Sequence, residues 1–307
     1  MRRIILTYCL LGCLLVVNAQ HRVNSFLEFS AGAGWSTLTY RYSPSIATLN
    51  ATQTGSYNFT FHAGYGLLFN SNVGLGIGVD VSRYGAATRL SGDAFWNDVT
   101  DTDGERYNHY THINKWNDSQ ELLYAEVPLT LYFFAPTQSS VWVSGEIGIK
   151  YGFPFKRRTA YSGSVTHRGL YPDWGMTAEN MPNHGFTERS LSDKQVMGMQ
   201  HQLFAFAKLG VMMPIGRQTY FFTHLYAACG MMNAVGKNGG KTDIGFRDES
   251  AESEQFYSFM PAYTSIINSS MTTGKFLPLS VGLEVGIRIR FSSSSAKYPC
   301  RCFDVEY

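Results

Sequence analysis

The sequence has few cysteines, little charge and no long apolar run after its first twenty residues. Its 307 residues include five cysteines, and only 16% of them are charged, whereas a globular domain usually carries about 25%. The formal net charge of +2 argues against a basic nucleic-acid-binding surface. No internal segment reaches the ~20 consecutive apolar residues of a membrane helix, so we expect no helical membrane span.

The N-terminal segment has the pattern of a secretory signal peptide. Arg2 and Arg3 form a positive start, 4–17 is apolar, and small residues lead up to position 19. We therefore exclude 1–19 from the fold. A lipoprotein cleavage box at 10–13 is the alternative, but cleavage there would split the apolar region.

Three cysteines would remain after removal of this signal. They are Cys229, Cys300 and Cys302, and an odd number gives no disulfide framework. Cys300 and Cys302 lie in a short C-terminal tail, 292–307, where Cys-Arg-Cys offers too few ligands for a metal site. We expect neither a metal nor another cofactor.

The sequence is instead rich in period-two alternation. In 276–291, every second residue from Leu277 to Phe291 is apolar, and the residues between them are mostly small or charged. Such alternation predicts a strand with one apolar face. Seven more segments alternate in a similar way: 26–40, 56–69, 73–84, 122–134, 141–155, 203–213 and 219–231.

The second face of these strands is polar, which a sandwich core would not accept. A barrel with lipid outside and a polar lumen would accept it. The connections alternate between long loops (41–55, 88–120, 157–200, 233–273) and short turns (70–72, 135–139, 214–218). Long loops at one end are typical of outer-membrane barrels. We predict an all-β fold over 20–291, an eight-stranded antiparallel transmembrane β-barrel with short periplasmic turns and long extracellular loops.

Two other folds remain open at this point. A ten-stranded barrel would take an extra hairpin from 255–268. A soluble lipocalin-like barrel would reverse the facing and place the apolar residues inside.

Residues 20–291 resemble the small eight-stranded outer-membrane barrels, the class that contains the OmpA barrel domain and OmpX. The Ala-Gln end of the signal and the aromatic loops also resemble barrel proteins of Bacteroidota. Phe291 matches the aromatic end of the family's assembly signal, with Gly286 upstream. The resemblance implies a Gram-negative cell outer membrane with both termini periplasmic. It implies outer-membrane lipid, lipopolysaccharide and the barrel-assembly machinery as partners. The tail departs from the family, whose closing strand usually ends the chain.

Charged residues fall on the lumen face of the strands. They are Glu28, Asp80, Glu126, Glu146, Lys150, Lys208, Glu284, Arg288 and Arg290, and His62 and His224 join them. Buried charges need partners. Because the first and last strands meet at closure, we expect Glu28 to pair with Arg288 or Arg290. Glu126 or Glu146 would pair with Lys150 or Lys208. These salt bridges would close the lumen; a gated narrow pore is the alternative.

Aromatic residues near the strand ends are candidates for the two girdles at the membrane interfaces. Those near the loops are Trp35, Tyr40, Tyr57 and Tyr84, and those near the turns are Phe69, Phe133, Trp142, Tyr220 and Phe291.

The loop 88–120 carries four aromatic candidates for contact with an extracellular protein or glycan. They are Trp96, Tyr107, Tyr110 and Trp116. They could equally pack the loop onto itself. Asp98, Asp101, Asp103 and Glu105, with Gly104, hint at calcium, but their spacing fails the EF-hand template.

The predicted function is a non-enzymatic, structural or surface-interaction barrel whose long loops form the contact surface. A narrow porin-like channel is the alternative, and an enzyme at the rim is the third possibility. His167, His184, His201, Ser190 and Ser192 lie in or beside the second long loop. No spacing among them singles out a nucleophile with its base.

Overall fold

The computed structural model describes residues 24–42, 49–101, 104–137, 140–182, 185–235, 263–269 and 272–291. They form one antiparallel sheet of ten strands. The strands are β1 (Asn24–Tyr42), β2 (Leu49–Leu68), β3 (Val73–Thr100), β4 (Arg106–Pro136), β5 (Trp142–Tyr171), β6 (Met176–Ala178), β7 (Glu188–Val196), β8 (Gln202–Pro214), β9 (Thr219–Gly230) and β10 (Thr272–Phe291).

Two short 3-10 helices accompany these strands, η2 (Pro172–Trp174) and η4 (Ile266–Asn268). In this described part of the chain, no helix is long and apolar enough to cross a membrane. The predicted signal and the tail with Cys300 and Cys302 lie outside the described residues.

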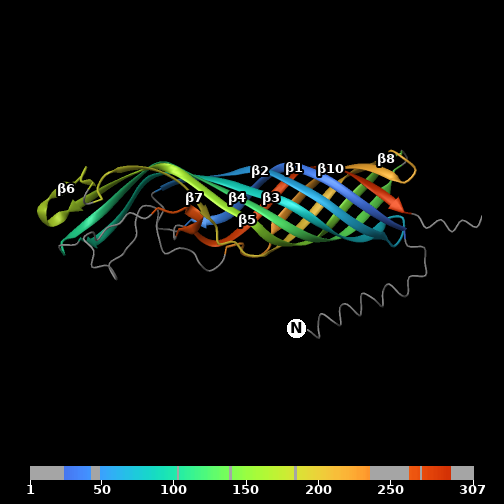
Figure 1. The fold of residues 1–307 in the computed structure, drawn as a ribbon, viewed down its shortest axis with the longest axis horizontal. Helices are drawn as coiled ribbons and strands as arrows, with labels where there is room; N and C mark the ends of the chain where they lie inside the picture. The colour runs from blue at the N-terminus through green and yellow to red at the C-terminus, as the bar shows by residue number, and fades with distance from the viewer. Residues whose placement is uncertain are drawn as a thin grey trace, which may run out of the picture.

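Eight of the ten strands close a ring. The order around it is β1, β2, β3, β4, β5, β8, β9 and β10. β10 pairs with β1 over their full lengths, from Ser25 opposite Phe291 to Tyr42 opposite Thr272. Figure 1 shows this barrel in one half of the molecule, with a long slender sheet leaving it. The predicted eight-stranded antiparallel barrel is confirmed.

The facing of the side chains is that of a transmembrane barrel. On β3, Leu75, Ile77 and Val79 point outward with 40%, 57% and 58% of their surface exposed, whereas Asp80, on the inner face, is 1% exposed. The other ring strands repeat this pattern of apolar residues outside and polar residues inside. Such an exterior suits lipid, not water. The lipocalin-like alternative is therefore wrong.

Charged side chains mark the level at which the strands leave the lipid. Arg83, Glu121 and Lys156 follow the apolar exterior of β3, β4 and β5. Glu121 Oε1 lies 3.3 Å from Arg83 Nε, and its Oε2 lies 2.9 Å from Lys156 Nζ. Ion pairs of this kind belong in water or headgroups rather than in the hydrocarbon core. The three short turns of the ring lie at its opposite end.

Three strands continue far beyond this level. β3, β4 and β5 contain 28, 31 and 30 residues, whereas a span needs only about 9–11. With the start of β2, and with β7 paired to β5, they form a sheet that the predicted orientation places outside the cell, and we therefore call it the extracellular sheet. The prediction that 88–120 and 157–200 are loops is therefore wrong over most of their length.

The ten-stranded alternative gives the right number of strands in the sheet, but it takes the two extra strands from the wrong segment. The two extra strands are β6 and β7, which come from the second long connection and lie outside the ring. Among the described residues of 255–268, namely 263–268, the chain is coil followed by η4. Residues 255–262 lie outside the described part.

A short piece of the third long connection packs back onto the barrel mouth. We call residues 263–269 the strap. Ile266 and Ile267 are 0% and 2% exposed. Ile266 packs with Leu90, Ile113 and Trp116 of the extracellular sheet. Ile267 belongs to a second cluster, which contains Tyr84 and Phe204 of the barrel. The strap therefore covers the inner face of the sheet where it meets the barrel.

Candidate functional site

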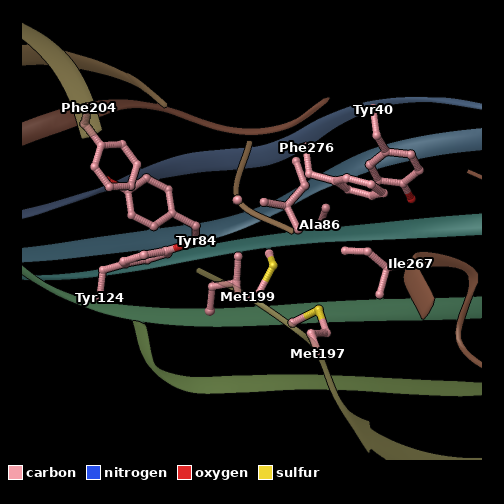
Figure 2. Packing of buried hydrophobic residues seen from close by; sticks show 12 residues of the cluster. Tyr40, Tyr84, Ala86, Tyr124, Met197, Met199, Phe204, Ile267 and Phe276 are labelled. Atoms are coloured by element: carbon pink, nitrogen blue, oxygen red, sulfur yellow. The ribbon is translucent and has the colours of Figure 1, made fainter. Parts of the chain in front are cut away.

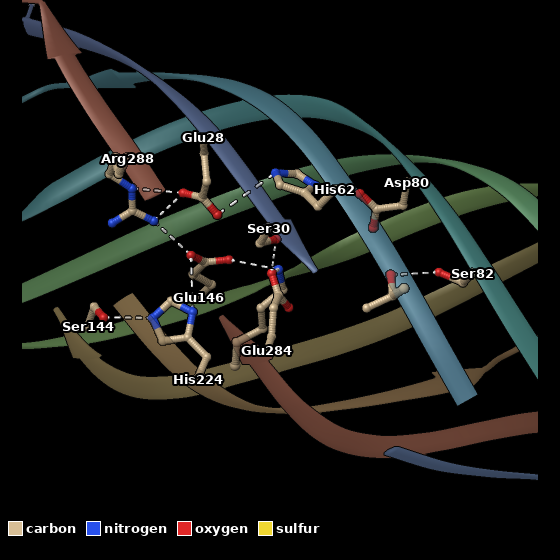
Figure 3. A network of polar contacts seen from close by, with 12 residues as sticks. Glu28, Ser30, His62, Asp80, Ser82, Ser144, Glu146, His224, Glu284 and Arg288 are labelled. Atoms are coloured by element: carbon tan, nitrogen blue, oxygen red, sulfur yellow. Dashed lines mark hydrogen bonds and ion pairs between the residues drawn. The ribbon is translucent and has the colours of Figure 1, made fainter. Parts of the chain in front are cut away.

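A network of charged side chains crosses the lumen (Figure 3). The residues are supplied by all eight ring strands, and each is at most 7% exposed: Glu28, His62, Asp80, Glu126, Glu146, Lys150, Lys208, His224, Glu284 and Arg288. The set contains five carboxylates and three permanent cations. Each of the three cations contacts two carboxylates.

Arg288 connects the seam of the barrel with the opposite wall. It donates from Nε to Oε2 of Glu28 at 2.8 Å and from Nη2 to the same oxygen. Nη2 also donates to Oε1 of Glu146 at 2.9 Å. Charge-assisted hydrogen bonds like these offset the cost of burying the ions.

The two lysines bridge the remaining carboxylates. Lys208 Nζ lies 2.8 Å from Glu284 and 3.4 Å from Glu146. Lys150 Nζ lies 3.4 Å from Glu126 and also pairs with Asp80. Glu146 contacts both Lys208 and Arg288. The Lys208–Glu284 pair and the Glu28–Arg288 pair therefore belong to one continuous network.

His62 links the two halves of the network. Its Nδ1 hydrogen-bonds with Asp80, and its Nε2 lies 3.9 Å from Glu28. The Asp80–Lys150 pair is thereby joined to the Glu28–Arg288 pair, so a single connected set of polar groups fills the cross-section.

Aromatic rings seal this network on the side of the short turns. The guanidinium carbon of Arg288 lies 4.8 Å from the ring centres of Phe26 and Phe134, 5.1 Å from Tyr132 and 5.2 Å from Phe222. Cation–π contacts of this kind stabilise a desolvated guanidinium. Room for these rings comes from small neighbours: a Cβ on Gly66 would lie 2.2 Å from the Phe26 ring.

A second apolar cluster, which we call the extracellular seal, closes the network on the side of the extracellular sheet (Figure 2). Tyr84 stacks on Phe204 with ring centres 5.1 Å apart, and Tyr124 meets both rings edge-on. Met197 and Ile267 belong to the same cluster. Between the two seals lies a cavity of about 10 Å³, which is room for about one water molecule. The lumen is packed rather than open.

Arg290 lies apart from the network, unlike its expected place among the lumen charges. Its guanidinium carbon stands 4.6 Å from the Tyr220 ring, 5.3 Å from Trp142 and 5.6 Å from Phe134. Trp142 and Tyr220 are half-buried around it rather than facing lipid. Arg290, Trp142 and Tyr220 line the rim of the barrel on the side of the short turns.

The other girdle candidates form two groups, one that faces outward and one that faces into the barrel. Five are outward and at least 40% exposed: Trp35, Tyr57, Phe69, Phe133 and Phe291. Tyr40 and Tyr84 are 6% and 1% exposed and belong to the extracellular seal. Their assignment to a girdle is wrong because each shares the inward parity of its strand.

Ser144, His224 and Glu146 have the order of a hydrolase triad. Ser144 Oγ lies 2.7 Å from His224 Nε2, and His224 Nδ1 lies 3.7 Å from Glu146. All three are at most 1% exposed, and Glu146 is also the acceptor for Arg288. A nucleophile needs room for a reacting atom about 3 Å away, and this one has none. The trio is part of the packing of the lumen.

The rim residues considered for catalysis do not gather into such a group. Among the described residues, His201 stacks on Tyr151 and meets Phe153 edge-on, and Ser190 and Ser192 lie on β7. His184 lies outside the described part. No cluster of three or more potential metal ligands occurs in that part either, and Asp103 lies outside it.

Three of the four aromatic contact candidates turn inward. Trp116 is fully buried and stacks on Tyr161 with ring centres 4.9 Å apart. Tyr107 is 1% exposed and stacks on Tyr171, and Trp96 is partly buried. Tyr110 alone is well exposed, at 38%. For Trp116 and Tyr107, a role in direct surface contact is wrong, because they pack the sheet onto its own coverings.

Asp118 is a buried carboxylate that the sequence analysis missed. Its Oδ2 accepts hydrogen bonds from Ser265 Oγ at 2.6 Å and from the Ile266 backbone N–H at 2.5 Å, and its Oδ1 accepts one from Thr159 at 2.6 Å. Burial raises the pKa of the Asp118 carboxyl, and these hydrogen bonds oppose the shift. Through these hydrogen bonds Asp118 fixes the strap to β4. The signal was present: Asp118 is the one charged residue on the inward face between Trp116 and Tyr124.

A pair of buried histidines lies farther out in the sheet. His109 Nε2 and His167 Nδ1 are 3.1 Å apart, and His167 Nε2 lies 3.0 Å from the Tyr263 hydroxyl. Burial lowers the pKa of His109 to about 3, and the His167 charge adds to the shift. Burial lowers the pKa of His167 to about 4, with Arg189 acting in the same direction. Both imidazoles are therefore neutral at pH 7.

No protein-family model matches the chain, and no curated protein is similar to it in sequence. The outer membrane protein OprG of Pseudomonas aeruginosa is 11% identical over 89% of this chain and 98% of its own, with a TM-score of 0.33. Neisserial surface protein A is 11% identical over 88% and 100%, with a TM-score of 0.32. A major outer membrane protein of Thermus thermophilus is 12% identical over 88% and 100%, also with a TM-score of 0.32. At these TM-scores, it is the strand pairing and the facing of the chain itself that identify a transmembrane β-barrel.

Proposed function

We propose that this chain is a non-enzymatic outer-membrane protein whose barrel anchors a rigid extracellular sheet for contact with other molecules. The observation that supports this most is the packed lumen. A continuous ion-pair network lies between two aromatic seals, with room for about one water in a cavity of about 10 Å³. A conducting pore needs a continuous wet path.

The length of the extracellular sheet supports the second half of the proposal. β3, β4 and β5 each carry more than ten residues past the ion pairs of Glu121, and every residue of β7 is at least partly exposed. A paired sheet holds its surface residues in fixed positions, which favours recognition over a mobile loop. In this arrangement the short turns and both termini are periplasmic. Lipopolysaccharide surrounds the outer half of the barrel, and the barrel-assembly machinery inserts it.

Conductance tests the closed lumen. The mature chain, 20–307, is refolded into a planar bilayer, and heat-modifiable gel migration verifies that the barrel has formed. We expect no steady openings. Regular openings that change when Glu28 or Arg288 is neutralised would overturn the proposal in favour of a narrow channel.

A truncated barrel tests the contact role. In this variant, 90–115 of the β3–β4 hairpin is replaced by a tight turn, and 159–196 by a short linker. The barrel should still fold, but cells displaying it should lose adhesion to protein-coated and glycan-coated surfaces relative to cells displaying the full chain. Equal adhesion by the two forms would contradict a contact role for the sheet.

A further inference from the structure

A polar hollow lies on the outward face of the extracellular sheet, where β2, β3 and β4 run side by side. It encloses about 420 Å³, within the range of about 300–1,000 Å³ usual for small-molecule sites. Six polar residues line it: Asn50, Thr52, Arg89, Ser91, Lys115 and Asn117. Each of them is exposed, so the hollow opens to solvent.

Irregular backbone on two neighbouring strands shapes this hollow. β3 shifts its register between Leu90 and Gly92, and β4 shifts between Asn114 and Asn117. Lys115 lies in the β4 irregularity with φ +51°, and Gly92 has φ +129°. A left-handed backbone is costly for a lysine and tends to occur at functional positions. Bulges of this kind re-aim side chains and are common beside binding sites.

The hollow carries positive charge without a carboxylate to neutralise it. Among the described residues, neither Arg89 nor Lys115 forms an ion pair, and no carboxylate lines the hollow. Two other exposed cations of this sheet are paired: Arg168 lies 3.4 Å from Glu179, and Lys156 lies 2.9 Å from Glu121. The amides and hydroxyls around the two free cations add both donors and acceptors. This donor set fits an anionic group attached to a polyhydroxyl body.

An aromatic pair continues the same outward face toward the tip. Phe95 and Tyr110 are register partners on β3 and β4. Their rings stack with centres 6.3 Å apart and are 53% and 38% exposed. Between this pair and the hollow, Asp93 hydrogen-bonds with His112 at 2.7 Å. The electron-rich ring faces suit the C–H groups of a sugar ring.

We propose that the hollow and the adjoining Phe95–Tyr110 pair bind an anionic carbohydrate. Arg89 and Lys115 would hold a carboxylate or sulfate group, the amides of Asn50 and Asn117 would bond ring hydroxyls, and the aromatic pair would carry a following sugar. The inference rests on the proposed contact role and names the class of ligand. Arg89 lies about 20 Å along β3 from Arg83, at about 3.3 Å per residue, so the site stands clear of the lipid.

Binding to the full mature chain in lipid nanodiscs tests the proposal. The probes are a sulfated dextran oligosaccharide, the unsulfated oligosaccharide of the same length, and inorganic sulfate. The test variant is Arg89→Gln/Lys115→Gln. The matched control, Arg158→Gln/Lys194→Gln, removes the same charge from exposed positions of β5 and β7 outside the hollow. Heat-modifiable gel migration shows that each variant has folded.

We expect the sulfated oligosaccharide to bind most tightly, and the test variant to weaken it about tenfold or more, because each lost charged hydrogen bond costs affinity. The control should change affinity by less than about twofold, as expected for distant surface charges. Tyr110→Ala should weaken the oligosaccharide but not inorganic sulfate. Equal losses in the test and control variants would mean diffuse charge attraction and would overturn the proposal. Equal binding of the unsulfated probe, or of inorganic sulfate, would do the same.

A further arm separates two sources of acidic sugar. If lipopolysaccharide in the nanodisc blocks the added probe, the site takes sugars of its own membrane; if affinity is unchanged, it takes a glycan from outside. Failure of the hollow is also distinct from failure of the contact role. Adhesion that is lost on truncating the sheet but kept in Arg89→Gln/Lys115→Gln would overturn this inference and leave the proposed function standing.

Discussion

Arg288 and Glu28 are register partners across the seam where β10 closes onto β1, and the guanidinium donates to the carboxylate from both Nε and Nη2. The same Nη2 reaches Glu146 on β5 at 2.9 Å. The closing strand is therefore fastened by its backbone to β1 and by one side chain to the far wall. Closure of the ring and packing of the lumen depend on the same residue.

Removing one partner of this pair should destabilise the barrel more than removing both. Arg288→Met leaves Glu28 buried without its cation, so we expect a loss of about 3–5 kcal/mol in the free energy of unfolding. The double variant Glu28→Gln/Arg288→Met should recover part of that loss. Urea unfolding in micelles measures the free energy of unfolding of the wild type, of Glu28→Gln, of Arg288→Met and of the double variant.

Arg290→Met is the matched control for this cycle. It removes the neighbouring arginine, which stacks 4.6 Å from Tyr220 at the rim, and should cost only about 1 kcal/mol, the size of a partly exposed cation–π contact. Strictly additive effects of the Glu28 and Arg288 substitutions would contradict the coupling.

The Ser144–His224 pair should be chemically silent in the folded barrel. A fluorophosphonate probe needs access to the serine oxygen, and Ser144 is fully buried. We therefore expect no labelling of the folded wild type above the level of Ser144→Ala. Labelling that disappears in Ser144→Ala and follows the folded band on the gel would revive the enzyme interpretation.

The membrane part of the fold could be predicted from the sequence because lipid and lumen impose opposite demands on alternate residues. Leu75, Ile77 and Val79 face lipid, and Asp80 faces its partners in the lumen, so parity along the strand reports both. Parity also places Glu28 and Arg288 inside. Which carboxylates each cation contacts depends on side-chain packing across the lumen. The pattern of one strand does not contain this information.

The extracellular sheet escaped prediction because water replaces lipid on its outer face. Residues such as Ser91, Asn114 and Asn117 are polar and turn-forming and so favour loops by composition. The pairing that holds them in strands comes from the inner face, where Trp116 stacks on Tyr161. The contact between Asp118 and the strap joins segments 148 positions apart, which no local pattern reveals.

The two aromatic candidates Trp116 and Tyr110 should behave in opposite ways. Trp116→Ala empties a fully buried site beside Tyr161 and should cost about 3–5 kcal/mol of stability in the sheet. Tyr110→Ala removes an exposed ring and should stay within about 0.5 kcal/mol. Thermal unfolding measured by the protease resistance of the sheet distinguishes them. A Trp116→Ala protein as resistant as the wild type would contradict the stacking.

Asp118→Asn should release the strap without opening the barrel. Ser265 and Ile266 donate to Oδ2, whereas Thr159 and Gln120 donate to Oδ1. An asparagine amide has only one acceptor atom, so the donors on one of these two sides would face an NH₂ group and lose their acceptor. Leaving a buried donor unsatisfied costs about 1–3 kcal/mol. Hydrogen exchange should rise in 263–269 and stay unchanged in the ring strands. The matched substitution Asp93→Asn, at an exposed ion pair with His112, should leave exchange in the strap as it is.

Acidification should loosen the extracellular sheet around His109 and His167. Burial holds their pKa values at about 3 and about 4, below the ordinary value of 6.5, so the unfolded sheet binds more protons than the folded one. Their contribution to stability is complete above pH 6.5 and is lost as the pH falls toward 4, by about 2 kcal/mol for each histidine at pH 5. Hydrogen exchange of 106–113 and 163–171, corrected for its intrinsic pH dependence, should therefore rise between pH 7 and pH 5. His109→Phe should reduce this rise, and His112→Gln, which alters an exposed histidine, should not. A rise of the same size in His109→Phe would place the titrating group elsewhere.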